Sequence, residues 1–247
     1  RRLEGIIHEV ETAESDFFLD LLSHDIKNHL QGVKMITDYY HIDETILQSS
    51  DFIERIEKNV NSIFELIFNI EKYRTVQRGG GFTHLSMKEL TPIIKETMSK
   101  VTNNFPNKEI KVDLEIDESI SYWINANEFI EDVLANLFSN AIKHNNKEQV
   151  EIELTISSNL IRGVDYWVVS ISDNGPGISE EKRKYLFTGK LRKDGSGIGL
   201  SIVKNIIDGY NGKITVMNKE DDNGEILGAV FMILFPIAQM ALEPVVT

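Results

Sequence analysis

One stretch of the sequence joins a carboxylate to two glycines directly after an apolar run. The segment 173–177 (DNGPG) follows the strand-like run 167–171. A carboxylate at the end of a strand can accept a hydrogen bond from an amino group, and glycines let the backbone lie close to a flat ring. Adenine offers both features, so Asp173, Gly175 and Gly177 are candidate adenine-binding residues. An ordinary turn after a strand has the same composition, and this motif alone does not separate the two interpretations.

A second glycine-rich segment, 195–200 (GSGIGL), stands immediately before an apolar stretch that is predicted to be helical from Ser201. Backbone N–H groups of such glycines can approach phosphate oxygens, and the N-terminus of the helix adds positive potential. The dinucleotide fingerprint would need glycine at position 200, and no GxxxxGK[ST] P-loop occurs in the chain. The candidate phosphate-binding residues are Gly195, Gly197, Gly199 and Leu200. A flexible loop without a ligand is the alternative.

Polar side chains follow one face of the predicted helix 127–145. Asn136, Asn140, Lys143 and His144 are spaced at i, i+4, i+7 and i+8. Amide oxygens on an otherwise apolar helix suit Mg²⁺, which takes a few hard oxygen ligands and keeps its waters. A lysine one turn further on can meet a terminal phosphate. We therefore expect Asn140 to bind the metal, with a solvated polar face as the alternative for any one of these residues.

The N-terminal part of the chain carries a histidine with an acid directly after it, in the segment 23–28 (SHDIKN). Asp25 can accept a hydrogen bond from one ring nitrogen of His24, which fixes the tautomer and raises the nucleophilicity of the other nitrogen. If Leu19 is heptad position a, His24 falls at position f, on the outside of a helix bundle. Asn28 lies on the same helix face, one turn on. The spacing predicts an exposed, activated imidazole that a second domain can reach.

Residues 1–78 are expected to form a helical hairpin that positions this histidine. Apolar residues recur at alternating spacings of three and four along 19–40 and again along 53–70. The segment 49–51 (SSD) supplies N-cap chemistry for the second helix. Two helices with apolar stripes cannot bury both faces alone, so we expect a homodimer whose two hairpins form a four-helix bundle. A coiled-coil spacer without chemistry is the alternative.

The glycines at 79–81 break the helical pattern, so residues 79–83 are expected to be a linker. A second domain follows at 84–237, and residues 238–247 form a tail. Helices are predicted near 88–103, 127–145 and 200–211, and strands near 109–116, 149–157, 165–173, 213–218 and 226–236. This alternation predicts an α/β sandwich with a mixed sheet and helices on one of its faces.

The composition narrows the classes of ligand and location. The 39 acidic and 26 basic residues give a net charge of -13, which weighs against nucleic acid and against an anionic membrane surface as partners. Without cysteine there is no disulfide framework and no thiol nucleophile. No apolar run reaches the roughly 18 residues of a membrane helix. Because the chain begins at Arg1, we expect a cytoplasmic fragment whose membrane attachment, if any, is in a missing upstream segment.

In their order and spacing, the segments 136–144, 173–177 and 195–200 resemble the N, G1 and G2 boxes of histidine kinases, within the wider ATPase superfamily that includes gyrase. The segment 23–28 resembles the H box of the same family, and 178–193 resembles its F box and mobile ATP lid. The lid residues that the resemblance implies are Phe187, Lys190, Arg192 and Lys193. The lid is short here and lacks a second aromatic residue often found in it. The resemblance covers residues from about 15 to 236.

The resemblance implies an enzyme that uses ATP and Mg²⁺ to phosphorylate His24 and then transfers the phosphoryl group to an aspartate of a response-regulator receiver domain. Gyrase-like members place a glutamate four residues before the metal-binding asparagine, as general base for water. Asn136 stands there in this chain and cannot take a proton. Asn28 matches the family pattern H-[DE]-x-x-[NT], in which the amide orients water to dephosphorylate the partner. Phosphatase activity toward the regulator is therefore a hypothesis.

The chain departs from the family pattern at His29, where many members have a proline that bends the helix. His29 lies on the apolar seam and is interpreted as a packed histidine in an unbroken helix. An ATPase or a protein serine kinase of the same superfamily is the alternative enzyme, against which Asn136 and the H box argue. A non-catalytic dimeric scaffold is the other alternative, against which Asn140 and Asp173 argue.

Overall fold

The structure is a computed structural model that describes residues 84–188 and 198–238, together with a few positions of the N-terminal part. Those positions are helical, as predicted, and comprise Lys27, 30–32, Lys34, Asn59, Val60 and Ile63. The predicted phosphoacceptor His24, its neighbours Asp25 and Asn28, and His29 lie outside the described residues. The association of the hairpin into a four-helix bundle stays a prediction.

The chain divides into two compact units. One comprises Arg1–Gln77 and Gly189–Ile198, and the other comprises Arg78–Thr188 and Gly199–Thr247. The α/β fold belongs to the second unit. No helix in the described ranges is long and apolar enough to cross a membrane.

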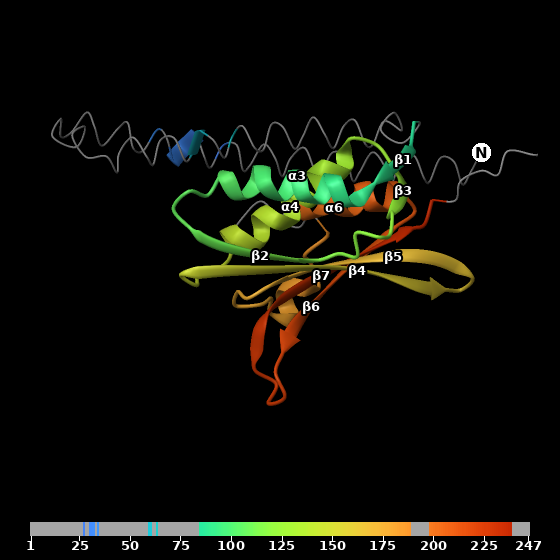
Figure 1. The fold of residues 1–247 in the computed structure, drawn as a ribbon. Helices are drawn as coiled ribbons and strands as arrows, with labels where there is room; N and C mark the ends of the chain where they lie inside the picture. The colour runs from blue at the N-terminus through green and yellow to red at the C-terminus, as the bar shows by residue number, and fades with distance from the viewer. Residues whose placement is uncertain are drawn as a thin grey trace, which may run out of the picture. The chain divides into compact units, whose positions relative to one another are not determined.

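Five strands form a mixed sheet in the order β2-β4-β5-β7-β6 (Figure 1). They are β2 Glu109–Glu115, β4 Gln149–Ile161, β5 Val164–Asp173, β6 Lys213–Glu220 and β7 Ile226–Pro236. β2 runs parallel to β4, and the other neighbours are antiparallel. A separate antiparallel pair is formed by β1 Ser86–Glu89 and β3 Trp123–Ala126. The prediction of an α/β domain with a mixed sheet is confirmed.

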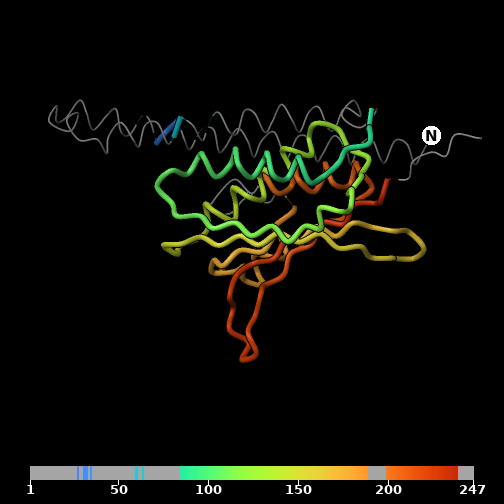
Figure 2. The backbone as a smooth tube through the Cα atoms, in the orientation of Figure 1, coloured from blue at the N-terminus to red at the C-terminus, as the bar shows by residue number. Residues whose placement is uncertain are grey.

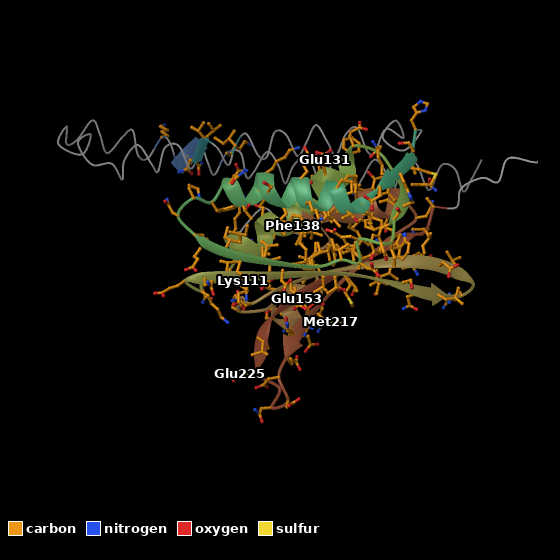
Figure 3. The ribbon with its side chains drawn as sticks, viewed as in Figure 1. Lys111, Glu131, Phe138, Glu153, Met217 and Glu225 are labelled. Atoms are coloured by element: carbon orange, nitrogen blue, oxygen red, sulfur yellow. The ribbon has the colours of Figure 1, made fainter. Side chains whose placement is uncertain are left out.

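Three helices cover one face of the five-stranded sheet: α3 Leu90–Asn103, α4 Phe129–Lys143 and α6 Ile198–Gly209 (Figure 1). A fourth and much shorter helix, α5 Glu180–Arg183, follows β5 in the chain. Seven residues of α4 are buried, and Phe138 among them points into the space between the helices and the sheet (Figure 3). These residues form a broad apolar face, and α4 buries this face in the core.

The sheet meets these helices with every second residue of its strands. Val150, Ile152 and Leu154 of β4 are buried, whereas Glu151 between them is exposed. This alternation follows from the two-residue period of a strand, which turns successive side chains to opposite faces. Charged residues such as Lys111 and Glu153 project from the face opposite to α3, α4 and α6 (Figure 3). The prediction that helices occupy one face is therefore correct.

Several predicted boundaries were wrong by a few residues. The helix predicted from 88 begins at Leu90, because residues 86–89 pair with β3 and Glu89 caps the helix by accepting the Thr91 N–H at 3.2 Å. The strand predicted to end at 157 continues to Ile161. The elements β1, β3 and α5 were not predicted at all, since each is only four residues long and shows too little periodicity to be detected.

Candidate nucleotide-binding site

Asp173 is the last residue of β5, and its carboxylate accepts backbone hydrogen bonds just beyond the end of the β5–β7 pairing. The last backbone pair between β5 and β7 joins Ser172 and Val230. Beyond it, Oδ1 of Asp173 accepts the N–H of Gly175 at 2.8 Å and the N–H of Ala229 at 3.3 Å. Burial raises the pKa of Asp173 above its usual value, and these two N–H groups work in the opposite direction. The side chain is thus a partly desolvated acceptor held in one orientation.

The loop after Asp173 has the backbone form that its glycines were predicted to allow. Gly177 has φ +70°, a conformation that residues with a side chain rarely adopt. A Cβ at Gly177 would overlap with Ile226, and a Cβ at Gly175 would lie 2.8 Å from Oδ1 of Asp173. Gly177 is therefore favoured by both its φ and the space around it, whereas a side chain at Gly175 would displace the carboxylate of Asp173.

An asparagine pair that sequence reasoning missed ties this loop to the end of α4. Asn145 is only 5% exposed, and its Nδ2 donates to Oδ1 of Asn174 at 2.7 Å. The same Oδ1 of Asn174 accepts the N–H of Glu151 at 3.0 Å, and its Nδ2 donates to the carbonyl of Gln149 at 3.1 Å. Asn174, the second residue of the segment 173–177, therefore links this loop to strand β4 and to Asn145. The sequence signal was present, since an asparagine directly after an acid at a strand end is a frequent turn former.

Lys108 is a second residue that the sequence did not reveal. Its Nζ donates to the carbonyl of Ile142 at 2.6 Å and to the carbonyl of Asn145 at 2.9 Å. These carbonyls lie at the C-terminal end of α4, where a cation is favoured by the helix dipole. Lys108 thus holds the helix end from which Asn145 reaches the loop 173–177.

On α4, the structure brings the two predicted asparagines together. Nδ2 of Asn140 donates to Oδ1 of Asn136 at 2.9 Å, and both residues are half-buried. Gly199, in the first turn of α6, lies against them: a Cβ there would be 2.5 Å from Nδ2 of Asn136. The helix predicted to bind metal and the glycine predicted to lie near phosphate are therefore neighbours.

The remaining predicted residues are placed as follows. Lys143 and His144 lie at the end of α4, with much of each side chain open to solvent. Partial desolvation of the His144 ring, together with the charges of Lys143 and Lys182, lowers the pKa of His144. The negative charge of Asp173 acts on the pKa of His144 in the opposite direction. Phe187 is half-buried in the turn after α5, and Leu200 is half-buried in α6. The lid residues Lys190, Arg192 and Lys193, with Gly195 and Gly197, lie outside the described residues.

The donor set of α4 fits a magnesium ion. Since the NH₂ group of Asn140 is committed to Asn136, its Oδ1 is the atom with which it would bind the ion. Within the described residues, no group of three or more His, Asp or Glu side chains forms a metal site. An ion held here would therefore take most of its ligands from phosphate oxygens and water.

Comparison with known proteins identifies the family. Residues 125–239 match the family described as histidine kinase-, DNA gyrase B-, and HSP90-like ATPases. The chain is 29% identical over 220 residues to the adaptive-response sensory kinase SasA of Microcystis aeruginosa, which covers 83% of this chain and 56% of that protein. It is 25% identical over 231 residues to the sensor histidine kinase ZraS of Salmonella typhimurium, covering 87% and 44%. Residues 125–239 therefore carry the ATPase domain of this family, and the chain is similar to sensor histidine kinases over more than four fifths of its length.

Solved structures of histidine kinases are also similar to this chain. The catalytic domain of histidine kinase ThkA is 28% identical, with a TM-score of 0.53, and covers 64% of this chain and all of that one. The Acinetobacter baumannii histidine kinase AdeS superimposes with a TM-score of 0.64 over 87% of this chain and 98% of that one, and at 17% identity this likeness shows the fold alone. The kinase spans about half the length of the curated relatives it matches.

The predicted resemblance to sensor histidine kinases and the predicted ATP-binding α/β domain are therefore confirmed. The roles of the individual site residues stay predictions.

Proposed function

We propose that this kinase transfers the γ-phosphoryl group of ATP to His24 and then to an aspartate of a response-regulator receiver domain. The observation that carries the proposal is the Asp173 carboxylate. Its Oδ1 is occupied by the N–H groups of Gly175 and Ala229, and no described residue bonds to its Oδ2. Oδ2 is therefore the atom that would accept a hydrogen bond from the amino group of adenine.

The polar face of α4 would hold the phosphates and Mg²⁺. Oδ1 of Asn140 would bind the ion, with Asn136 orienting that amide through their hydrogen bond. Mg²⁺, when bound, neutralises the charge that develops on the phosphate oxygens. Lys143 is exposed one turn further along the helix, from where its ammonium group could meet the terminal phosphate.

The same face supports a protein acceptor rather than water. The position at which an ATPase of this superfamily would carry a general base is occupied by Asn136, whose amide cannot take a proton and already accepts a hydrogen bond from Asn140. Attack by water is therefore slow, and a nucleophile must come from the protein itself.

In the proposed step, a neutral ring nitrogen of His24 forms a bond with the γ-phosphorus. The bond between that phosphorus and the β,γ-bridging oxygen breaks, and ADP leaves with the electron pair. Asp25 would hold the His24 tautomer, and two helical hairpins in a homodimer would present the ring. A receiver-domain aspartate would then take the phosphoryl group from the imidazole. We further propose that this takes place in the cytoplasm, where ATP is supplied.

Asn28 would support a phosphatase activity toward the phosphorylated regulator. Its amide, one helical turn from His24, would orient water for attack on the phosphoaspartate of the partner. An Asn28→Ala variant should then retain autophosphorylation and lose most of the phosphatase activity. Equal dephosphorylation of the receiver by this variant and the wild type would exclude the role.

The main proposal is tested by the chemical stability of the phosphoryl group on the protein. Incubation with Mg·ATP should give a phosphoprotein that is stable in alkali and labile in acid, as a phosphoramidate is. His24→Gln should abolish the labelling while ADP still binds, and Asp173→Ala should abolish both. Acid-stable label, or undiminished labelling of His24→Gln, would contradict the proposal.

A further inference from the structure

The loop 173–178 is held from one side by the hairpin of β6 and β7, which projects away from the helices (Figure 2). Asn218 of β6 makes two hydrogen bonds to a single residue of this loop. Its Oδ1 accepts the N–H of Ile178 at 2.9 Å, and its Nδ2 donates to the carbonyl of Ile178 at 3.2 Å. The side-chain amide thereby takes the place of one rung of a β-ladder.

The neighbouring strand makes contact with the other end of the loop. A Cβ at Gly228 of β7 would overlap with the carbonyl oxygen of Asp173, so that the two backbones touch. The next residue, Ala229, gives its N–H to Oδ1 of Asp173. The hairpin therefore fixes both the carboxylate at the start of the loop and the peptide at its end.

Asn218 also lies directly against the glycine predicted to face the base. A Cβ built on Gly177 would lie 3.0 Å from Oδ1 of Asn218. Because Gly177 is free of side-chain restraint, its φ of +70° has to be maintained by the groups around it. The Ile178 peptide, bonded on both its N–H and its C=O, is the nearest such anchor.

We propose that Asn218 is a positioning residue for adenine binding, an inference that rests on the proposed function of Asp173. Only a side chain with both a donor and an acceptor can satisfy Ile178 in this way. Alanine removes both bonds, and aspartate keeps the acceptor but turns a carboxylate oxygen toward the Ile178 carbonyl. Either change releases the loop from the position in which it would meet the base, and ordering it again reduces affinity.

The experiment compares two nucleotides on the full chain by titration calorimetry. ADP has the 6-amino group that Asp173 would recognise, and inosine diphosphate has a carbonyl there instead. The variants are Asn218→Ala and Asn218→Asp. The matched control is Asn223→Ala, since Asn223 lies in the turn of the same hairpin and, among the described residues, makes its hydrogen bonds to Asp221.

Wild type should prefer ADP to inosine diphosphate. Asn218→Ala should bind ADP about tenfold more weakly, as expected for the loss of a hydrogen-bonded pair. It should lose less affinity for inosine diphosphate, so that the ratio of the two affinities becomes smaller. Asn218→Asp should show the same two changes. The control should stay within about twofold of wild type.

The Asn218 variants could melt at a lower temperature and yet bind ADP with the dissociation constant of the wild type. That result would overturn the positioning role of Asn218 and leave the proposed nucleotide site intact. If Asn218→Ala does not fold, Asn218→Asp decides the question. A wild type without preference for ADP would instead overturn adenine recognition by Asp173, and this inference with it.

Discussion

Replacing Lys108 by methionine tests how the end of α4 is held. The Nζ of Lys108 donates at 2.6 and 2.9 Å to two carbonyls at the C-terminal end of this helix, those of Ile142 and Asn145. Hydrogen bonds from a charged donor contribute about 1.5–3 kcal/mol each, and a cation at a helix C-terminus adds about 0.3–1 kcal/mol. Lys108 is only half-buried, so water can replace part of this in the variant. We therefore expect a loss of about 2 kcal/mol in the free energy of unfolding.

The assay can be confined to the α/β domain. The chain has two tryptophans, Trp123 and Trp167, and both lie in that domain. Urea unfolding followed by tryptophan fluorescence should show a lower midpoint with an unchanged slope. A thermal scan should show a midpoint lower by roughly 4–8 °C, the shift expected for about 2 kcal/mol in a domain of this size.

The control is Lys111→Met, at an exposed position of β2. It removes the same charge and adds the same side chain, and should change the free energy of unfolding by less than about 0.5 kcal/mol. If Lys108→Met were as stable as wild type, or if the control lost as much, the cap would contribute nothing and the reasoning would be refuted.

Three further predictions concern the nucleotide site. Asp173→Asn keeps an oxygen for both N–H groups and removes a buried charge, so the domain should be at least as stable at pH 7 while ADP affinity, measured by calorimetry, falls at least tenfold. Loss of stability in this variant would argue against the desolvation of Asp173. Gly199→Ala should displace the Asn136 amide and weaken Mg·ATP binding about tenfold, with little loss of secondary structure by circular dichroism. The pKa of His144 is lower in the folded state than in the unfolded state, so the unfolded state takes up a proton first and the folded state loses stability as pH falls below the ordinary value of about 6.5. His144→Gln should therefore flatten the decline of the unfolding free energy between pH 7 and 5. An unchanged decline would exclude this contribution.

The larger elements of the fold could be predicted from the sequence because their patterns are long. Helix α4 carries its period over 15 residues, and strand β4 alternates between exposed or half-buried and buried residues from Gln149 to Leu154. The pair of β1 and β3 could not be predicted, because two strands of four residues are specified by each other and not by their own periodicity. The length of β4 was underestimated since it ends in an exposed hairpin, where Arg162 and Gly163 turn with positive φ.

The residues of the candidate site also differ in how far the sequence could reveal them. Asp173, Gly175 and Gly177 could be found because their chemistry is concentrated in five consecutive residues. Asn145, Asn218 and Gly228 could not, since their significance comes from contacts with residues far away in the chain. A side-chain amide on an ordinary strand gives no local sign that it bonds to a loop 40 residues earlier.

The central claim, that ATP bound at Asp173 phosphorylates His24, is tested most directly by locating the phosphoryl group. The wild-type chain would be labelled with Mg·ATP, digested under alkaline conditions, and its peptides sequenced by mass spectrometry. The account predicts phosphate on the imidazole of His24, and none in Asp173→Ala. Phosphate on another histidine or on a hydroxyl side chain, or equal labelling of the Asp173 variant, would contradict it.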